Sequence, residues 1–246
     1  MSAHSKLSPS SRHRWSKCPG SVREEAKYPD SSGEAALDGT RSHELLEHCL
    51  TEVVLPQSLV GELISGFIVD AERAARVQIA YDYIVQADDY YSERRVSPAK
   101  YVMRDDMDGT ADAILLHDRC LEIVDYKDGV SPVSAVGNAQ MEVYALGALA
   151  RFGAIYETVK MTIIQPKLAI RGLPTISSHE ITVDELLAKV PGIIAEAAAT
   201  DAPDAPLIPG ESQCKWCKAK GNCPALVEKS LELVNVSALD LSLIHI

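Results

Sequence analysis

Two acidic residues and a lysine lie where the sequence predicts two neighbouring strands. Asp125 and Lys127 close an apolar run that begins at Cys120, and side chains two positions apart on a strand share a face. Asp112 lies in the preceding apolar run, Gly109–Leu116, and the short polar segment between the runs predicts a β-hairpin. Pairing within this hairpin brings Asp112 close to Asp125. Because converging carboxylates repel each other unless a cation lies between them, the hairpin indicates a metal site.

Four further polar residues could reach the same place. His43 lies on a predicted upstream helix and offers an imidazole as a third ligand. Glu47, one turn later, is either an additional ligand or part of a solvated helix face. Gln140 and Tyr144 lie one turn apart on a predicted downstream helix and share a face. Taken singly, each of these residues, like an isolated Asp-x-Lys, is typical of an ordinary surface or core position, so the hypothesis depends on the ordered set.

The residue types in this set suit one kind of chemistry. Hard oxygen ligands with one imidazole favour Mg²⁺ or Mn²⁺. Hydrolysis of a phosphodiester needs a nucleophilic water, charge relief at the non-bridging oxygens and help for the leaving oxygen. Lys127, beside the metal, could position that water or stabilise the transition state.

The ordered motifs resemble those of the RecB-like branch of the PD-(D/E)XK nucleases: Gly39-x-x-x-His43, Gly109-x-x-Asp112, Asp125-x-Lys127 and Gln140-x-x-x-Tyr144. This resemblance covers about residues 34–166. It implies a restriction-endonuclease-like α/β core, with a mixed central sheet flanked by helices, and a metal-dependent deoxyribonuclease activity. It also implies roles for each residue: metal binding by His43, Asp112 and Asp125, water orientation or charge stabilisation by Lys127, and assistance by Gln140 and Tyr144. The family's name permits Asp at position 125, and the family's proline is replaced by Ala111.

A second set of candidate ligands consists of cysteines. Cys214-x-x-Cys217 and Cys223 lie close in sequence near the C-terminus, and Cys18 is the best candidate for a fourth ligand. Thiols stay reduced in the cytoplasm, so clustered cysteines there suggest metal ligation rather than disulfides. On spacing alone, Zn²⁺ and an iron–sulfur cluster fit equally well.

One early cysteine and a terminal C-x₂-C-x₅-C, placed around the four motifs, resemble the iron staple of CRISPR-associated and AddB-type exonucleases. The resemblance implies a [4Fe–4S] cluster that joins the N- and C-terminal segments, held by Cys18, Cys214, Cys217 and Cys223. Zn²⁺ on the same residues is the alternative. Trp216 is interpreted either as a shield for the sulfurs or as an ordinary packing residue, and Cys49 and Cys120 as small buried apolar residues.

Charge gives a mixed indication. The net charge of −11 argues mildly against nucleic-acid binding. A local basic patch around the cysteines could nevertheless hold DNA, or it could be an ordinary solvated surface. It would consist of Arg12, Arg14, Lys17, Lys215, Lys218 and Lys220. The polar N-terminus lacks a signal-peptide pattern and no run reaches membrane-span length, so the expected compartment is the cytoplasm, with no membrane partner.

The elements that must position these residues follow from periodicity. Helices are predicted from Glu34 to about Val54, with Leu37, Leu45, Leu46 and Leu50 inward, over 59–93, over 134–151, and over 182–200 with a break at Pro191. Strands are predicted around Tyr101–Met103, at Gly109–Leu116, Cys120–Lys127, Val159–Gln165 and Thr175–Ile181. The predicted organisation is an N-terminal arm (1–33), a core (34–200) with a helical insertion (about 55–95), a linker and cysteine segment (201–234), and a tail (235–246) that is truncated or foreign.

The leading hypothesis is a DNA exonuclease of phage recombination or DNA processing that acts on ends or single strands, with a recombination protein or helicase as partner. The chain as a whole resembles phage relatives of the CRISPR-associated exonucleases, whose function is unknown. Two alternatives belong to other classes of protein. One is a catalytically silent DNA-binding module with the same fold, and the other is a zinc-stapled adaptor.

Overall fold

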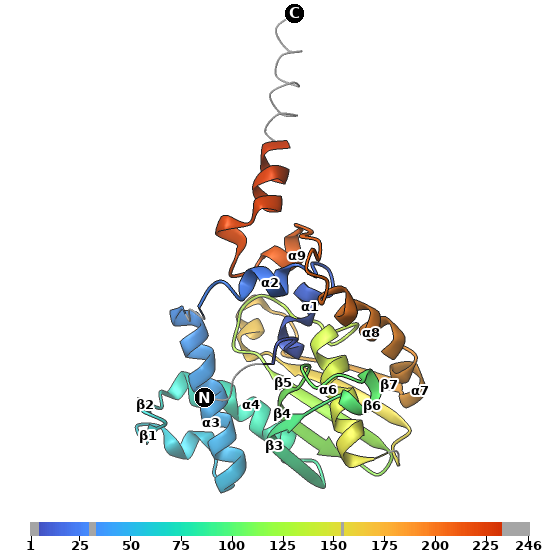
Figure 1. Cartoon of the computed structure of the whole chain (residues 1–246). Coiled ribbons are helices and arrows are strands. Elements are labelled where there is room, and N and C mark those ends of the chain that lie inside the picture. The colour runs from blue at the N-terminus through green and yellow to red at the C-terminus, as the bar shows by residue number, and fades with distance from the viewer. Residues whose placement is uncertain (1–4, 30–32, 154, 233–246) are drawn as a thin grey trace, which may run out of the picture. The chain divides into compact units, whose positions relative to one another are not determined.

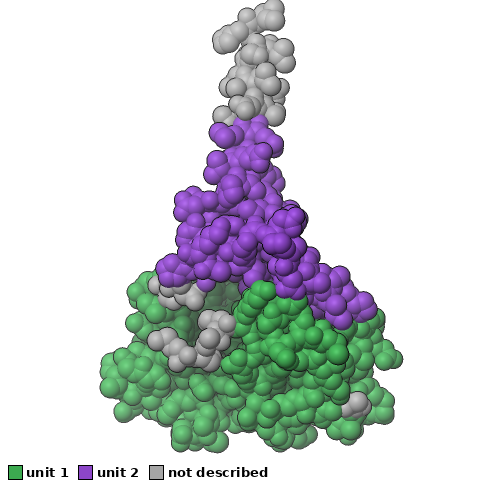
Figure 2. Space-filling view, in the orientation of Figure 1, with its two compact units in different colours: residues 1–10, 31–190 green, residues 11–30, 191–246 purple. Residues whose placement is uncertain are grey.

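The computed structural model (Figure 1) describes residues 5–29, 33–153 and 155–232. They form two compact units, coloured separately in Figure 2. Unit 1 comprises residues 1–10 and 31–190, and unit 2 comprises residues 11–30 and 191–246. Among the described helices, none has the length and apolarity of a membrane span.

A five-stranded mixed sheet forms the centre of unit 1, with the strand order β3-β4-β5-β6-β7. Only β5 and β6 are parallel, and the other neighbours within this sheet are antiparallel. The predicted mixed sheet flanked by helices is therefore confirmed. Its strands are β3 (Asp89–Val96), β4 (Gly109–Leu116), β5 (Cys120–Tyr126), β6 (Thr158–Ile164) and β7 (Ile176–Thr182).

Helices pack on both faces of this sheet. Side chains of α3 (Glu34–Glu52) and α4 (Ala71–Ile84) form one apolar core with Val124 and Tyr126 of β5. The alternate residue Asp125 points to the opposite face, where it meets α6 (Ala139–Phe152). One strand therefore separates an apolar layer from a polar site, as the period of two in a strand requires.

Local sequence signals explain where several helices begin. The Asp70 side chain accepts a hydrogen bond from Arg73 N at the start of α4, at 2.7 Å. Asn138 caps α6 in the same way, and Thr182 forms a capping box with Glu185 at α7 (Val183–Leu187). These side chains satisfy amide groups that have no partner within the helix. The helix predicted over 182–200 is split as expected, because α7 ends at Leu187 and α8 (Val190–Ala199) begins one residue before Pro191.

Two predicted elements are wrong. The stretch 59–93 is not purely helical, because it holds the hairpin of β1 (Leu63–Ile64) and β2 (Phe67–Ile68) before α4, and the start of β3 after it. Ser65 and Gly66 both have positive φ, which matches a two-residue hairpin turn. The segment around 101–103, expected to be a strand, belongs to the short helix α5 (Ala99–Val102). At the start of this helix, the Pro98 carbonyl accepts a hydrogen bond from the backbone N–H of Val102 at 3.0 Å.

The N-terminal arm contains three short helical segments within residues 9–25. One of the four inward positions predicted for α3 is wrong. Leu45, Leu46 and Leu50 are buried, but Leu37, in the first turn of α3, is 41% exposed. Residues 224–232 are helical, and the predicted tail 235–246 lies outside the described residues. The remaining short elements are η1 (Pro9–Ser11), α1 (Arg12–Trp15), α2 (Ser21–Glu25), η2 (Pro56–Leu59), η3 (Pro166–Arg171), α9 (Glu211–Cys214) and η4 (Lys220–Asn222).

Candidate metal site

Three residues from three elements of unit 1 converge at one point. His43 of α3, Glu93 of β3 and Asp112 of β4 each place a ligand atom within 4.8 Å of the other two. His43 Nδ1 lies 3.3 Å from a carboxylate oxygen of Asp112. One imidazole and two carboxylates within this distance form a set that suits a small divalent cation.

The hairpin of β4 and β5 brings Asp112 to Asp125, as its sequence predicts. Ala113 pairs with Val124, so the next two residues, Asp112 and Asp125, lie opposite each other. An Asp112 oxygen also accepts the backbone N–H of Tyr126 at 2.6 Å. The side chain is thereby held by the strand that carries the second acid.

Asp125, Lys127 and Gln140 form a closed polar group beside these acids. Lys127 Nζ donates to Asp125 Oδ1 at 3.1 Å and to Gln140 Oε1 at 3.3 Å, and Gln140 Nε2 donates to Asp125 Oδ1 at 2.8 Å. Asp125 is only 3% exposed. Its Oδ2 lies 3.0 Å from Lys127 Nζ, yet within the described residues it accepts no hydrogen bond of good geometry. A buried carboxylate oxygen with spare acceptor capacity is suited to a cation.

Tyr144 completes the set that the sequence predicts. It lies one turn after Gln140 on α6 and is 6% exposed. Burial first, and then the charges of Asp125 and Asp112, raise the pKa of Tyr144, so its hydroxyl stays protonated near neutral pH. A Cβ on Gly109 would lie 3.0 Å from the Tyr144 ring, so the glycine of this motif permits a close approach.

Glu93 is the site residue that sequence reasoning missed, because it lies in a stretch that was predicted to be helical. It falls between the pairs Ser92↔Ala113 and Arg94↔Ala111, which places it opposite Asp112. Its φ of 45° lies in the left-handed region that residues other than glycine seldom adopt. The signal that could have found this strand is the aromatic pair Tyr90-Tyr91, since aromatic residues favour strands.

The charges of the site perturb one another strongly. Burial alone would lower the pKa of His43, but the carboxylates of Asp112 and Asp125 outweigh it and raise it to about 9. Burial, together with the charge of Asp112, raises the pKa of Glu93 to about 7. Burial would also raise the pKa of Asp112, but His43 holds it below its usual range, whereas burial raises that of Asp125. Such opposed shifts within one cluster are typical of functional sites.

Glu47, the open candidate for a further ligand, is exposed and lies outside the group that could share one ion. It is nevertheless close enough for its charge to contribute to the raised pKa of Glu93, after burial and Asp112. The solvated helix face is therefore the better interpretation of Glu47.

A charged network on the other face of β5 fixes these elements. The Asp128 side chain is fully buried and accepts hydrogen bonds from Ser42 Oγ at 2.8 Å and from Arg76 Nε at 2.9 Å. Lys167 Nζ lies 3.2 Å from the same carboxylate. Ser42 and Asp128 immediately adjoin His43 and Lys127 in the chain. We define Ser42, Arg76, Asp128 and Lys167 as the rear network, because it ties the helix that bears His43 to the end of β5.

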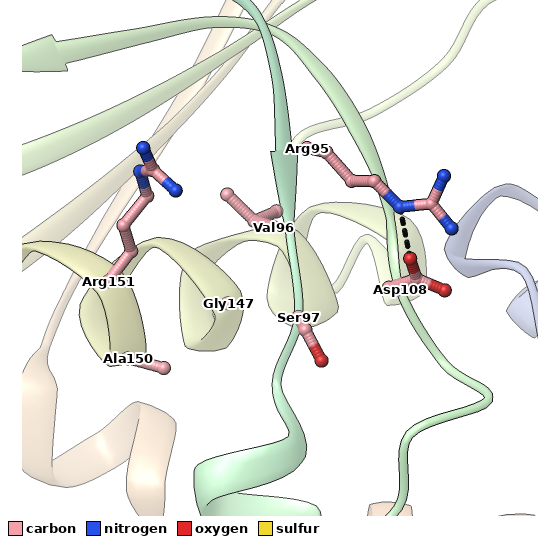
Figure 3. A pocket seen from close by; sticks show the side chains of 7 residues that line it. All are labelled: Arg95, Val96, Ser97, Asp108, Gly147, Ala150 and Arg151. Carbon is pink, nitrogen blue, oxygen red and sulfur yellow. Dashed lines mark hydrogen bonds and ion pairs between the residues drawn. The ribbon is translucent and has the colours of Figure 1, made fainter.

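A separate pocket of about 450 Å³ lies between the end of β3 and α6. Figure 3 shows Arg95 paired with Asp108 on one side of it and Arg151 on the other. Its lining includes none of the residues predicted for the site. The candidate site is therefore defined by the converging side chains and not by this cavity.

The four predicted cluster cysteines all lie in unit 2, and all are free thiols. The amides of Ile208 and Gly210 donate to Cys18 Sγ at 3.2 Å and to Cys214 Sγ at 3.4 Å. Burial raises the pKa of Cys18, and the charges of Cys214 and Cys223 add to that effect. Within the described ranges, however, no three cysteine sulfurs lie within 4.8 Å of one another, so the four do not form a closed site.

Several predictions for the other cysteines and for residues near the four predicted ligands need correction. Trp216 does not shield the sulfurs, because its side chain points outward and the residue is 68% exposed. Arg12 and Arg14 do not contribute to a basic surface, because they are buried and paired with Glu196 and Glu25. Among the other cysteines, Cys49 is buried as predicted, whereas Cys120 is only partly buried at the start of strand β5.

Comparison with known proteins gives a solved structure and a family. The solved structure titled "Crystal structure of SSO0001" is similar to this chain with a TM-score of 0.45 and 17% identity, over 92% of this chain and 89% of that one. The family described as "Protein of unknown function (DUF2800)" matches residues 4–244. Since this match spans nearly the whole sequence, the chain belongs to the DUF2800 family.

Proposed function

We propose that this protein is a divalent-metal-dependent deoxyribonuclease with a restriction-endonuclease-like core. The observation that supports it best is the convergence of His43, Glu93 and Asp112 beside the Asp125–Lys127 pair. Asp112 and the buried Asp125 lie opposite each other on a hairpin, and their charges repel unless a cation lies between them. Asp125 adds an oxygen with spare acceptor capacity, so the donor set fits Mg²⁺ or Mn²⁺.

Each residue then has a definable task. A bound metal supplies charge neutralisation at the phosphate and activates water. Burial alone would lower the pKa of Lys127, but the charges of Asp125 and Asp112 raise it, so the ammonium keeps its proton. A protonated Lys127 stabilises negative charge on the phosphate instead of removing a proton. Gln140 holds the Lys127 ammonium in place, and Tyr144 offers a hydroxyl donor on the same helix face.

We extend the proposal to the substrate and setting that the four motifs imply. The substrate is DNA, as ends or single strands, and the reaction is exonucleolytic within phage recombination or DNA processing. A recombination protein or a helicase is the expected partner. The support for this extension is the resemblance of the motifs alone.

We also propose that Cys18, Cys214, Cys217 and Cys223 hold a [4Fe–4S] cluster. Backbone amides donate to two of these sulfurs, and such hydrogen bonds are a usual feature of cluster ligands. One Zn²⁺ with four thiolates at about 2.3 Å would need the sulfurs about 4 Å apart. Among the described residues no three cysteine sulfurs come that close, and Zn²⁺ on the same four residues stays the alternative to the cluster.

The test of the nuclease is degradation of end-labelled single-stranded DNA with Mn²⁺, using anaerobically purified protein. Lys127→Ala should slow cleavage at least about a hundredfold, the usual cost of one lost charge-stabilising group. Lys100→Ala, an exposed lysine in the same unit, is the matched control and should cleave like wild type. Equal cleavage by wild type and Lys127→Ala would place the activity elsewhere. No cleavage by folded wild type would favour a silent DNA-binding module.

Metal analysis and the visible spectrum test the cluster separately. An iron–sulfur protein is brown, with broad visible absorption and acid-labile sulfide. A colourless protein that contains stoichiometric zinc would contradict the cluster and support the zinc alternative.

A further inference from the structure

Unit 2 presents one of the chain's two tryptophans to solvent on an anchored loop. Trp15 is 1% exposed, whereas Trp216 is 68% exposed. The main chain around Trp216 is nevertheless fixed: its carbonyl accepts Arg14 Nη1 at 3.3 Å, and the amide of Lys218 donates to Glu25 at 2.9 Å. An exposed ring on a fixed backbone loses little conformational entropy when a ligand covers it.

A largely buried ion pair supports this loop from beneath. Arg14 Nε lies 2.7 Å from Glu25, and their side chains are only 10% and 13% exposed. Both partners also bind the backbone beside Trp216, so neither charge is left uncompensated. The nearly buried Arg14–Glu25 pair therefore holds the backbone of this loop, while the Trp216 ring remains exposed to water.

The sequence around the ring is cationic. Residues 214–223 contain three lysines and no acidic residue, although the whole chain has a net charge of −11. The Lys215 ammonium lies 5.4 Å from the centre of the Trp216 ring. Lys218 and Lys220 are exposed as well. A ligand for this surface therefore combines a flat apolar face with negative charge.

We infer that Trp216 is a stacking site for an unpaired base of single-stranded DNA, with Lys215, Lys218 and Lys220 facing its phosphates. Every base offers a π-face, and aromatic residues among cations are the usual means of binding single strands without sequence preference. An acidic, apolar protein segment fits the charge but supplies fewer flat rings. The inference rests on the proposed function in naming DNA, but DNA binding can be measured without cleavage.

The experiment is a four-way comparison of the full-length protein, in Ca²⁺ without Mg²⁺ or Mn²⁺. The dissociation constants of wild type and Trp216→Ala are measured by fluorescence anisotropy on labelled oligo(dT) of about 15 nucleotides and on an abasic strand of the same length. Trp216→Ala should weaken oligo(dT) binding about tenfold and leave abasic-strand binding nearly unchanged. Trp216→Phe should restore most of the affinity. Val227→Ala, an exposed apolar residue of the same unit, should change nothing.

Three outcomes would overturn the inference. Equal losses on both strands would mean that Trp216 supports the fold of unit 2 and does not stack on a base. Unchanged binding by Trp216→Ala would remove the ring from the interface, and absence of binding by wild type would point to a protein ligand. Cleavage assays with Mn²⁺ on the same preparation keep the two proposals apart, because base stacking can hold even where no cleavage occurs.

Discussion

At the scale of single residues, Glu93 carries several unfavourable features at once. It has a positive φ, it is partly buried, and it lies opposite another carboxylate across two antiparallel strands. Each feature disfavours folding, since like charges opposite each other destabilise a sheet and left-handed backbone at such a residue costs about 1–3 kcal/mol. A cation bound between Glu93 and Asp112 would offset the repulsion. The strain therefore supports a ligand role for Glu93.

Glu93→Asn should make the metal-free protein more stable and its metal binding weaker. Asn tolerates the left-handed region and removes the repelling charge, so we expect a gain of about 1 kcal/mol, or about 2–4 °C in Tm. Because the pKa of Glu93 is raised to about 7, the charge is present, and the gain largest, above pH 7. Differential scanning calorimetry with and without Mn²⁺ measures both effects. Glu47→Gln, an exposed control on α3, should change little, and a lower Tm for Glu93→Asn would contradict the argument.

The affinity for Mn²⁺ should rise with pH because two ligands must lose protons. The pKa of His43 is raised to about 9 and that of Glu93 to about 7, so each remains protonated below its value. Metal binding releases those protons. Below pH 7, where both ligands lose a proton, we expect the affinity to rise up to about a hundredfold per pH unit. Between pH 7 and 9, where only His43 loses a proton, we expect a rise of about tenfold per pH unit. Calorimetric titrations at pH 6, 7 and 8 measure it. Glu93→Gln should lose the steeper part, and a pH-independent affinity would exclude these two ligands.

At the scale of elements, local patterns predicted the part of the site that lies on one hairpin. The apolar run that ends at Leu116 and the run that begins at Cys120 are separated by a short turn, and this turn fixes the register that places Asp112 opposite Asp125. Glu93 could not be found in this way. Its strand follows a real helix, α4, whose apolar spacing runs on into the aromatic residues, and its pairing partner β4 follows only after a further short helix. Long-range pairing decided this element, and the helical periodicity before it was misleading.

The rear network should control the position of α3, so Asp128→Asn should affect both stability and metal binding. The substitution removes the fully buried carboxylate that pairs with Arg76 and Lys167, which then keep only the part-exposed carboxylate of Asp38. Breaking a buried charge pair costs up to about 3–5 kcal/mol. Loss of the Ser42 contact also loosens the turn of α3 that bears His43. We expect a large drop in unfolding free energy and weaker Mn²⁺ binding.

Denaturant unfolding and Mn²⁺ titration test this expectation together. Asp70→Asn is the matched control, because Asp70 also pairs with an arginine of α4 but is 54% exposed, and asparagine keeps the helix cap. It should cost less than about 1 kcal/mol. Equal effects of the two variants would mean that burial of Asp128 has no special role.

At the scale of the whole molecule, the two candidate sites lie in different units. His43, Glu93 and Asp112 belong to unit 1, and the four cysteines to unit 2. Unit 2 joins segments far apart in the chain, as the bond from the Ile208 amide to the Cys18 sulfur shows across 190 positions. Hydrophobic periodicity cannot reveal such pairing, whereas the resemblance to the iron-staple nucleases implies that the N- and C-terminal segments are joined. Net charge is an average over the whole chain, so it does not reveal a local group of lysines such as Lys215, Lys218 and Lys220.

Cys18→Ser should therefore destabilise unit 2 and spare unit 1. Unit 2 is small, and a small unit with few buried apolar residues depends on staples such as a metal or cluster. Hydrogen exchange followed by mass spectrometry should show faster exchange in residues 11–29 and 191–232, with β3 to β7 unchanged and Mn²⁺ affinity within about twofold of wild type. Cys49→Ser, buried in the unit 1 core, should give the reverse pattern. Faster exchange in both units of Cys18→Ser would show that they fold as one, and an unaltered visible spectrum would remove Cys18 from the cluster ligands.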